Sequence, residues 1–197
     1  ADDIALLASA DAAAVSRLNG LDARNRSLPN LITNGDGAAS TVAEPLKGFI
    51  ASSAGAISTA YNAAQGSLWV LAANASGAVR NMISDWYYVD PNQPLSVALS
   101  GDPGPSAGAA RAYMYVQWGN NGVVVSPTPV TFLDATTVDW LDKRAAVIAT
   151  SPATGVNQFR LVIAMPNGFL AGAVSEIMAN YGAVPLPFND RARSEEN

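Results

Sequence analysis

The sequence predicts a mainly β fold, either a sandwich or a barrel, preceded by one α-helix at the N-terminus. From Leu31 onward, short apolar or alternating stretches are separated by Gly, Pro, Asn, Asp and Ser, which is typical of antiparallel β proteins. Residues 1–24 are instead rich in Ala and contain no Pro, as a helix favours. A hydrophobic fraction of 49% and a charged fraction of 14% supply a core and argue against disorder.

The N-terminal helix is expected within residues 1–27, which we treat as a segment for assembly or anchoring. Asp2 and Asp3 suit the positive end of the helix dipole, and Pro29 makes continuation of the helix unfavourable. Two interpretations stay open: the helix packs on its own domain, or it joins copies of this chain or a larger assembly. The apolar residues on the a and d positions of a heptad frame, the candidate oligomerisation residues, are Ile4, Leu7, Ala14, Leu18 and Leu21.

The β-rich body is expected over residues 28–183, with residues 184–197 as a C-terminal extension or linker. Leu31 and Ile32 are expected to begin the first strand, and the sequence NGDG at 34–37 to turn out of it. The sequence GNNG at 119–122 has the chemistry of a hairpin turn. The other strands are expected at 48–50, 56–61, 67–72, 79–88, 95–100, 111–118, 123–125, 130–133, 144–150, 158–165 and 172–178.

Charge and composition argue against several classes of function. The net charge is −5 with a pI near 4.5, so a basic surface for nucleic acid or anionic membranes is not supplied. The sequence has no Cys and no His, which removes disulfides, thiolate zinc sites and the commonest general base. Any metal ion would have to be a hard cation bound by oxygen atoms. We assign no metal-binding residue and expect no cofactor. No apolar run approaches the roughly 20 residues of a membrane-spanning helix, and the acidic N-terminus lacks the basic region of a secretion signal.

Alternation of side chains places candidate binding residues on one face of a strand. In the stretch AYMYVQW (residues 112–118), two tyrosines and a glutamine share one side, opposite apolar residues. Aromatic rings with hydrogen-bonding groups beside them suit the recognition of a sugar. The alternative is that the aromatic residues fill the core, as we expect of Trp69 and Trp118. The candidate carbohydrate-binding residues are Tyr113, Tyr115, Gln117 and Tyr88.

No catalytic residue is predicted, and we expect a protein that is not an enzyme. Glycoside hydrolysis requires two carboxylates held a few ångströms apart. Asp134, Asp139 and Asp142 form the one acidic concentration inside the body, and acids in or beside loops are usually solvated. The sequence contains neither a phosphate-binding loop nor a nucleophile elbow.

Several motifs follow one another along the chain: NLITNGD (30–36), QGSLWVLAANASGAVR (65–80), VDPNQPLS (89–96), PATGV (152–156) and EIMANYGAVPLPFND (176–190). Their order resembles the carbohydrate-binding-module-like jelly rolls of phage tail and fibre proteins. The last motif is similar to the ending of minor tail proteins of actinobacterial phages. The resemblance covers about residues 30–190 and implies a jelly-roll β-sandwich.

The resemblance also implies a structural calcium site, from which this sequence departs. Family members often continue the opening motif with Phe-Glu, whereas Gly37 and Ala38 stand here. Asp36 and Glu176 remain as oxygen ligands. We interpret Asp36 as a turn residue and Glu176 as a solvated strand residue.

The function implied by the resemblance is that of a structural virion protein, a minor tail or fibre subunit. Its jelly roll would bind a glycan of the host surface. The expected partners are further copies of this chain, with a trimer favoured, and other virion proteins. The protein would be assembled in the host cytoplasm and exposed on the particle surface. The alternatives are a carbohydrate-binding module accessory to a secreted enzyme and a capsid decoration protein.

Overall fold

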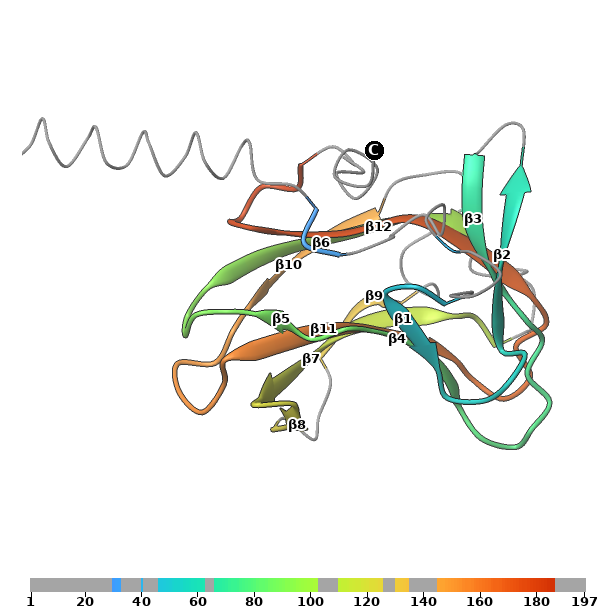
Figure 1. Ribbon diagram of the computed structural model, residues 1–197, viewed down its shortest axis with the longest axis horizontal. Coiled ribbons are helices and arrows are strands. Elements are labelled where there is room, and N and C mark those ends of the chain that lie inside the picture. Colours follow the sequence, from blue (N-terminus) through green and yellow to red (C-terminus); the bar gives the residue numbers. More distant parts are fainter. Residues whose placement is uncertain are drawn as a thin grey trace, which may run out of the picture.

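The computed structural model of the chain describes residues 30–32, 40, 46–62, 66–102, 110–125, 130–134 and 145–186. These residues form two curled β-sheets packed face to face (Figure 1), and they contain no helix, so none that could span a membrane. Residues 1–27, 187–197 and the turn at 34–37 lie outside the described residues. So do the predicted oligomerisation residues Ile4, Leu7, Ala14, Leu18 and Leu21, and the acidic residues Asp139 and Asp142.

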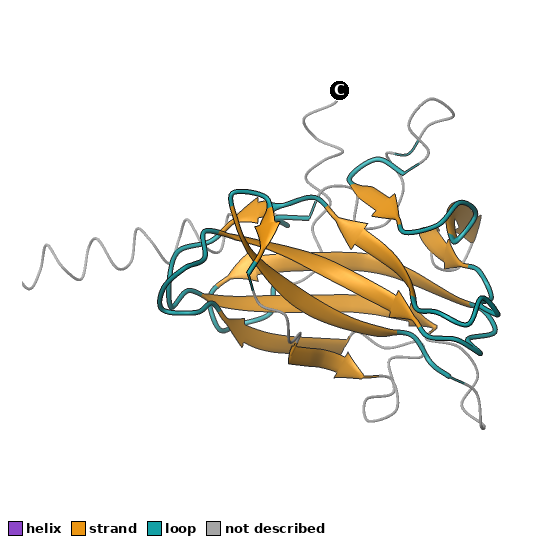
Figure 2. Cartoon of the chain, turned by 90° about the horizontal axis from the view of Figure 1, so that it is seen from below, coloured by secondary structure: helices purple, strands orange, loops and turns teal. Residues whose placement is uncertain are grey.

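Every strand pair of both sheets is antiparallel. The loops gather at the two ends of the strands, as Figure 2 shows. The β12 sheet consists, in order, of β10 (Ala145–Thr150), β6 (Pro94–Asp102), β12 (Gly172–Tyr181), β3 (Gly66–Leu71) and β2 (Ile57–Asn62). The β11 sheet follows the order β1 (Phe49–Ala51), β4 (Arg80–Ser84), β11 (Gln158–Met165), β7 (Tyr113–Asn120) and β8 (Val123–Val124), with β5 (Tyr87–Tyr88) also paired to β11 and β9 (Val130–Asp134) to β7.

The predicted strands from residue 48 onward all have counterparts, and their ends differ by at most three residues except where one strand is divided. The predicted hairpin turn is confirmed: Asn120 pairs with Val123, and Asn121 and Gly122 between them have φ of 50° and 82°. Two positive φ values in succession are what a tight hairpin turn requires, and Asn and Gly adopt them most readily.

Leu31 and Ile32 do not begin a strand, contrary to the prediction, but form a bend. The side chain of Asn30 replaces strand pairing with β12. Its Nδ2 donates to Ile177 O at 2.8 Å, and its Oδ1 accepts from Ala179 N at 3.1 Å. Leu31 N also donates to Ala179 O at 2.9 Å. Because the Asn30 side chain bonds to these backbone groups of β12, they are not available to pair with the backbone of a further strand.

The end of the described chain also contacts β12. Nδ2 of Asn180 donates to Val184 O at 3.0 Å, and its Oδ1 accepts from Leu186 N at 3.3 Å. Ser96 Oγ, on the neighbouring strand β6, donates to Gly182 O at 3.0 Å. The first and last described segments are therefore both hydrogen-bonded to the β12 sheet.

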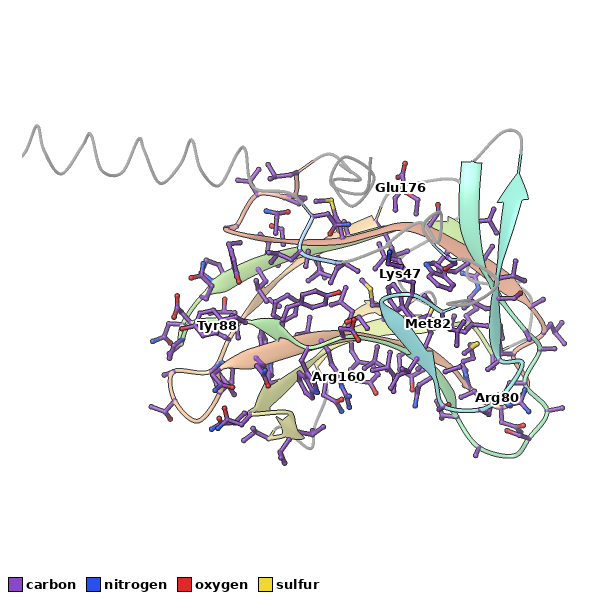
Figure 3. The ribbon with its side chains drawn as sticks, viewed as in Figure 1. Lys47, Arg80, Met82, Tyr88, Arg160 and Glu176 are labelled. Atoms are coloured by element: carbon purple, nitrogen blue, oxygen red, sulfur yellow. The ribbon has the colours of Figure 1, made fainter. Side chains whose placement is uncertain are left out.

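The hydrophobic core fills the space between the sheets, where Met82 lies in Figure 3. Trp69 and Trp118 are buried there, as predicted, with 0% and 6% of their surface exposed. The ring of Trp69 meets Phe49 edge-on, with centroids 5.1 Å apart. Each fully buried side chain of this size contributes about 1.5–3 kcal/mol through the removal of apolar surface from water.

A β-bulge divides the predicted strand at 79–88 into β4 and β5. Ile83 pairs with Val162, and Tyr87 pairs with Phe159. Three residues of one strand therefore stand opposite two of the other. Ser84 fills the gap in the ladder: its Oγ accepts from Leu161 N at 2.9 Å and donates to Asp85 O at 2.9 Å.

The extra residue reverses the alternation of side chains. Met82 and Ser84 face the core, and so does Tyr87, whose ring centroid lies 5.7 Å from that of Phe159. Without the bulge, Tyr87 would face outward. The side chain of the neighbouring Trp86 therefore lies on the outer face of the β11 sheet.

We predict that Ser84→Ala lowers the free energy of unfolding by about 1–3 kcal/mol, because the buried Leu161 N–H loses its acceptor. Urea unfolding followed by circular dichroism measures the change. Ser58→Ala is the control, since Ser58 is exposed on β2 and its loss is expected to cost less than about 0.5 kcal/mol. Equal stability of the two variants would contradict this role of Ser84.

Candidate functional site

Side chains of β7 alternate between the core and the outer face of the β11 sheet. Tyr113, Tyr115 and Gln117 are partly exposed, whereas the residues between them are buried in the core. The structure thus brings three of the four predicted carbohydrate-binding residues onto one face, in the order that the alternation predicts.

Tyr113 and Tyr115 form a stacked pair, with ring centroids 6.1 Å apart and an interplanar angle of 27°. Burial is the main cause that raises the pKa of Tyr115 above its ordinary value of 10.0; the neighbouring Tyr113 adds to the shift and Arg160 opposes it. The hydroxyl group of Tyr115 is therefore protonated at neutral pH and can donate a hydrogen bond. The pair offers a flat apolar surface with polar atoms at its rim.

Arg160 lies on β11 directly opposite Gln117. In Figure 3 it projects from the side of the β11 sheet that faces away from the β12 sheet. Its Nε donates to Gln117 Oε1 at 2.7 Å, and its guanidinium carbon lies 4.4 Å from the ring centroid of Trp86. Burial lowers the pKa of Arg160 from its ordinary value, yet a guanidinium stays charged in proteins.

Trp86 lies against Gly119, the residue of β7 that pairs with Gln158. A Cβ atom at Gly119 would stand 2.5 Å from both Cη2 and Cζ3 of the indole. The absence of a side chain at this position is therefore what allows the ring to approach the strand. Trp86 and Arg160 are held together in this way on the same face as the two tyrosines.

We call this set the aromatic platform. It runs along β7 from Tyr113 to Gly119, a distance of about 20 Å at the usual rise per residue of a strand. The stacked tyrosines occupy one end, the Trp86 ring the other, and polar side chains lie between them. Its members are Tyr113, Tyr115, Gln117, Arg160 and Trp86.

The β4 side of the platform has an apolar floor and one unsatisfied acceptor. Val162 and Ala164 are buried, with 1% and 0% of their surface exposed, and Ala164 pairs with Tyr113 on one side and Asn81 on the other. Asn81 Oδ1 is buried and has no hydrogen-bond partner among the described residues. Across two strand spacings, Asn81 lies about 10 Å from Tyr113. A buried acceptor left unpaired is costly.

Tyr88 lies away from the tyrosine pair. It pairs with Gln158, four residues along β11 from Val162, the partner of Tyr115, which corresponds to about 13 Å. Its side chain is 61% exposed, and its hydroxyl donates to Asp90 Oδ1 at 2.5 Å. That hydrogen bond is the main cause that raises the pKa of Tyr88.

Two members of the platform, Trp86 and Arg160, are missing from the residues that the sequence selects. The alternation in QFRLVIAM (residues 158–165) does place Arg160 on the side opposite the core residues. Its position beside Gln117 depends on the register of β11 against β7, which no local pattern reports. The outward turn of Trp86 depends on the bulge at Ser84.

The carboxylate of Glu176 lies on the other side of the molecule, outside the β12 sheet (Figure 3). It sits where β12 shifts register against β6, with φ of 51°, and its Oε2 accepts from Ser100 Oγ at 2.7 Å. Among the described residues, no group of three acidic side chains is placed to hold a metal ion. Asp36 lies outside the described residues, so the absence of a calcium site stays a prediction.

No protein-family model and no curated protein matches this chain. Among solved structures it is similar to the enzymatically active domain of tailspike protein 4 of bacteriophage CBA120, with a TM-score of 0.60 and 13% identity over 78% of this chain. The chain spans only 21% of that tailspike chain.

Carbohydrate-binding modules are also among the similar structures. The CBM22-1 xylan-binding domain of Paenibacillus barcinonensis Xyn10C has a TM-score of 0.47 and 11% identity, covering 77% of this chain and 93% of its own. The C-terminal family 22 module of Clostridium thermocellum Xyn10B has a TM-score of 0.47 and 8% identity, with 83% and 99% covered. The strands and their pairing show by themselves that the described part of the chain is mainly β, as the sequence predicts.

We predict that Gly119→Ala displaces the Trp86 ring from the strand and from Arg160. Crowding of this kind costs about 1–3 kcal/mol, to be measured by urea unfolding, and it also changes the tryptophan fluorescence. The same substitution in a Trp86→Ala background is the control, because there the added Cβ has no ring to displace. An equal cost in both backgrounds would show that the ring is not what Gly119 accommodates.

Proposed function

We propose that this chain is a glycan-binding domain that holds an extended oligosaccharide along the aromatic platform. The observation that supports this most is the alignment of a stacked tyrosine pair with a Trp–Arg pair on the outer face of the β11 sheet. Sugar rings have apolar faces that pack on aromatic rings, and hydroxyl groups that bond to amide, guanidinium and phenol groups. A platform of about 20 Å suits a chain of sugars better than a single ring.

The platform has further features that fit such a ligand. Gln117 is held by Arg160, so its amide is fixed before a ligand arrives, which reduces the entropy lost on binding. Apolar surface with a few polar groups in fixed positions is the usual composition of a small-ligand site.

We propose that the domain binds its glycan without cleaving it. Hydrolysis needs two carboxylates that flank the scissile bond. Among the described carboxylates, Glu176 lies outside the opposite sheet and Asp90 accepts a hydrogen bond from Tyr88. Asp85 is exposed next to Trp86 in the sequence and is a single carboxylate there, not a pair. Asp134, the first residue of the predicted acidic cluster, pairs with Tyr113 through the backbone at the end of β9. The activity of the tailspike domain is not transferred, because this chain spans a fifth of it.

We predict that the protein binds glycans on an array and that Tyr113→Ala with Tyr115→Ala weakens binding about tenfold or more, which is 1.4 kcal/mol or more. Titration calorimetry on the glycans selected by the array measures the change. Ile148→Ala is the matched control, because Ile148 is 46% exposed on β10 of the other sheet. It is expected to leave affinity unchanged.

Failure to bind any glycan would contradict the proposed function. Binding that survives the double tyrosine substitution would place the glycan elsewhere on the molecule and contradict the proposed site. Thermal unfolding of each variant separates loss of binding from loss of folding.

We further propose that the domain belongs to a phage tail, as a minor tail or fibre subunit whose N-terminal segment joins it to other copies. The support is the ordered resemblance of its motifs to tail proteins, together with a fold similar to part of a tailspike. The ligand would then be a glycan of the host surface. A module accessory to a secreted enzyme and a capsid decoration protein are the alternatives.

We predict that an antibody against the domain labels the tail of intact particles, and that the purified chain is a trimer by size-exclusion chromatography with light scattering. Deletion of residues 1–27 is expected to yield a monomer, since it removes the candidate heptad positions. A full-length chain that is already monomeric would contradict assembly through this segment. Labelling of the capsid, or of no part of a particle, would contradict a tail location.

A further inference from the structure

Arg160 is a partly buried cation that has no ion-pair partner among the described residues. Its neighbours on the platform are neutral: the amide of Gln117 on β7, the indole of Trp86 and the phenol of Tyr115. Moving a charge out of water is unfavourable unless an opposite charge or strong hydrogen bonds compensate. Only part of that compensation is supplied by these neutral groups.

Among the described residues, the one hydrogen bond of the Arg160 side chain uses its Nε–H and not its terminal nitrogen atoms. A guanidinium has five N–H donors, and the Nε–H is used by Gln117 Oε1 at 2.7 Å. The Trp86 ring covers one side of the guanidinium, whose carbon lies 4.4 Å from the ring centroid. This contact restricts the orientation of the guanidinium. The two terminal NH₂ groups of such a fork match the paired oxygen atoms of a carboxylate or a phosphate.

We propose that the platform binds a glycan that carries anionic groups, with Arg160 as the residue that binds the anion. The anion is either the carboxylate of a uronic acid or the phosphate of a phosphorylated sugar, since both offer paired oxygen atoms. This inference rests on the proposed glycan-binding function and names its class of ligand. The tyrosine pair would hold a neighbouring sugar ring of the same chain.

A role for Arg160 as a support for Gln117 alone explains less of this arrangement. A support needs only the Nε–H, whereas the observed packing also holds the charged fork against the indole and beside the tyrosine pair. Burial also disfavours the charged form of Arg160, as the lowered pKa reports, and a bound anion reverses that effect. The net charge of the protein is −5, so the protein as a whole does not attract an anion, and a local positive charge is needed.

Paired glycans that differ only in charge test the inference. Oligogalacturonate is compared with its carboxyl-reduced form, and a phosphorylated oligomannose with its phosphatase-treated form. On an array and by calorimetry, at least one charged member is expected to bind about tenfold or more tightly than its neutral counterpart, which is about 1.4 kcal/mol or more, because the guanidinium fork can pair with both oxygen atoms of the anion. The pair that shows the preference identifies the anion.

Variants of Arg160 test the residue. Arg160→Gln is expected to bring the ratio of charged to neutral affinity close to one, and Arg160→Lys to give an intermediate ratio, because lysine keeps the charge but lacks the fork. Arg80→Gln is the control: Arg80 lies on β4, where its Nη1 donates to the backbone of Ala73 at 3.4 Å. It is expected to keep the wild-type ratio.

The two levels of the proposal fail in different ways. If the charged and neutral members of both pairs bind equally, the preference for anions is wrong while glycan binding stands. If a preference is found but Arg160→Gln and Arg160→Lys keep the wild-type ratio, the assignment of the anion to Arg160 is wrong. If no glycan of the array binds at all, the glycan-binding function is wrong as well. The lysine variant keeps the long aliphatic stem, so it provides a folded protein for this comparison even where the glutamine variant is unstable.

Discussion

The register of β7 against β11 is the constraint on which both the core and the candidate site depend. It sets Tyr115 opposite Val162 and Gln117 opposite Arg160, so one face of each strand is apolar and the other carries the platform. Because side chains alternate with a period of two, a slip by one residue would expose the core and bury the polar face. The hydrophobic packing that stabilises the sandwich thereby also fixes the hydrogen bond between Gln117 and Arg160.

The sequence predicts the strands and the faces of β7 well, because both depend on patterns only a few residues long. Alternation in residues 112–118 and the Asn-Gly turn are local signals, and the structure confirms what they indicate. The bend at Leu31, the bulge at Ser84 and the pairing of Arg160 with Gln117 depend on contacts between residues far apart in the chain. A single sequence carries no pattern for such contacts, which is why Trp86 and Arg160 could not be selected from it.

Small and polar residues shape the platform as much as the aromatic ones do. Gly119 provides the space that Trp86 occupies, Ala164 provides a low floor beside Tyr113, and Ser84 replaces a backbone group in the ladder. None of these residues is aromatic or charged. Each instead determines where a larger side chain of the aromatic platform can lie. The positions of the aromatic and charged groups therefore depend on these small residues.

Both ends of the described domain are fastened to neighbouring residues of one strand, Asn30 to Ile177 and Ala179 and Leu186 to Asn180. This has a mechanical consequence. Tension applied between the two ends would be carried by a few hydrogen bonds near that strand, and it would bypass the opposite sheet. A domain held in this way can be pulled on through its attachments while the geometry of its outward face stays unchanged.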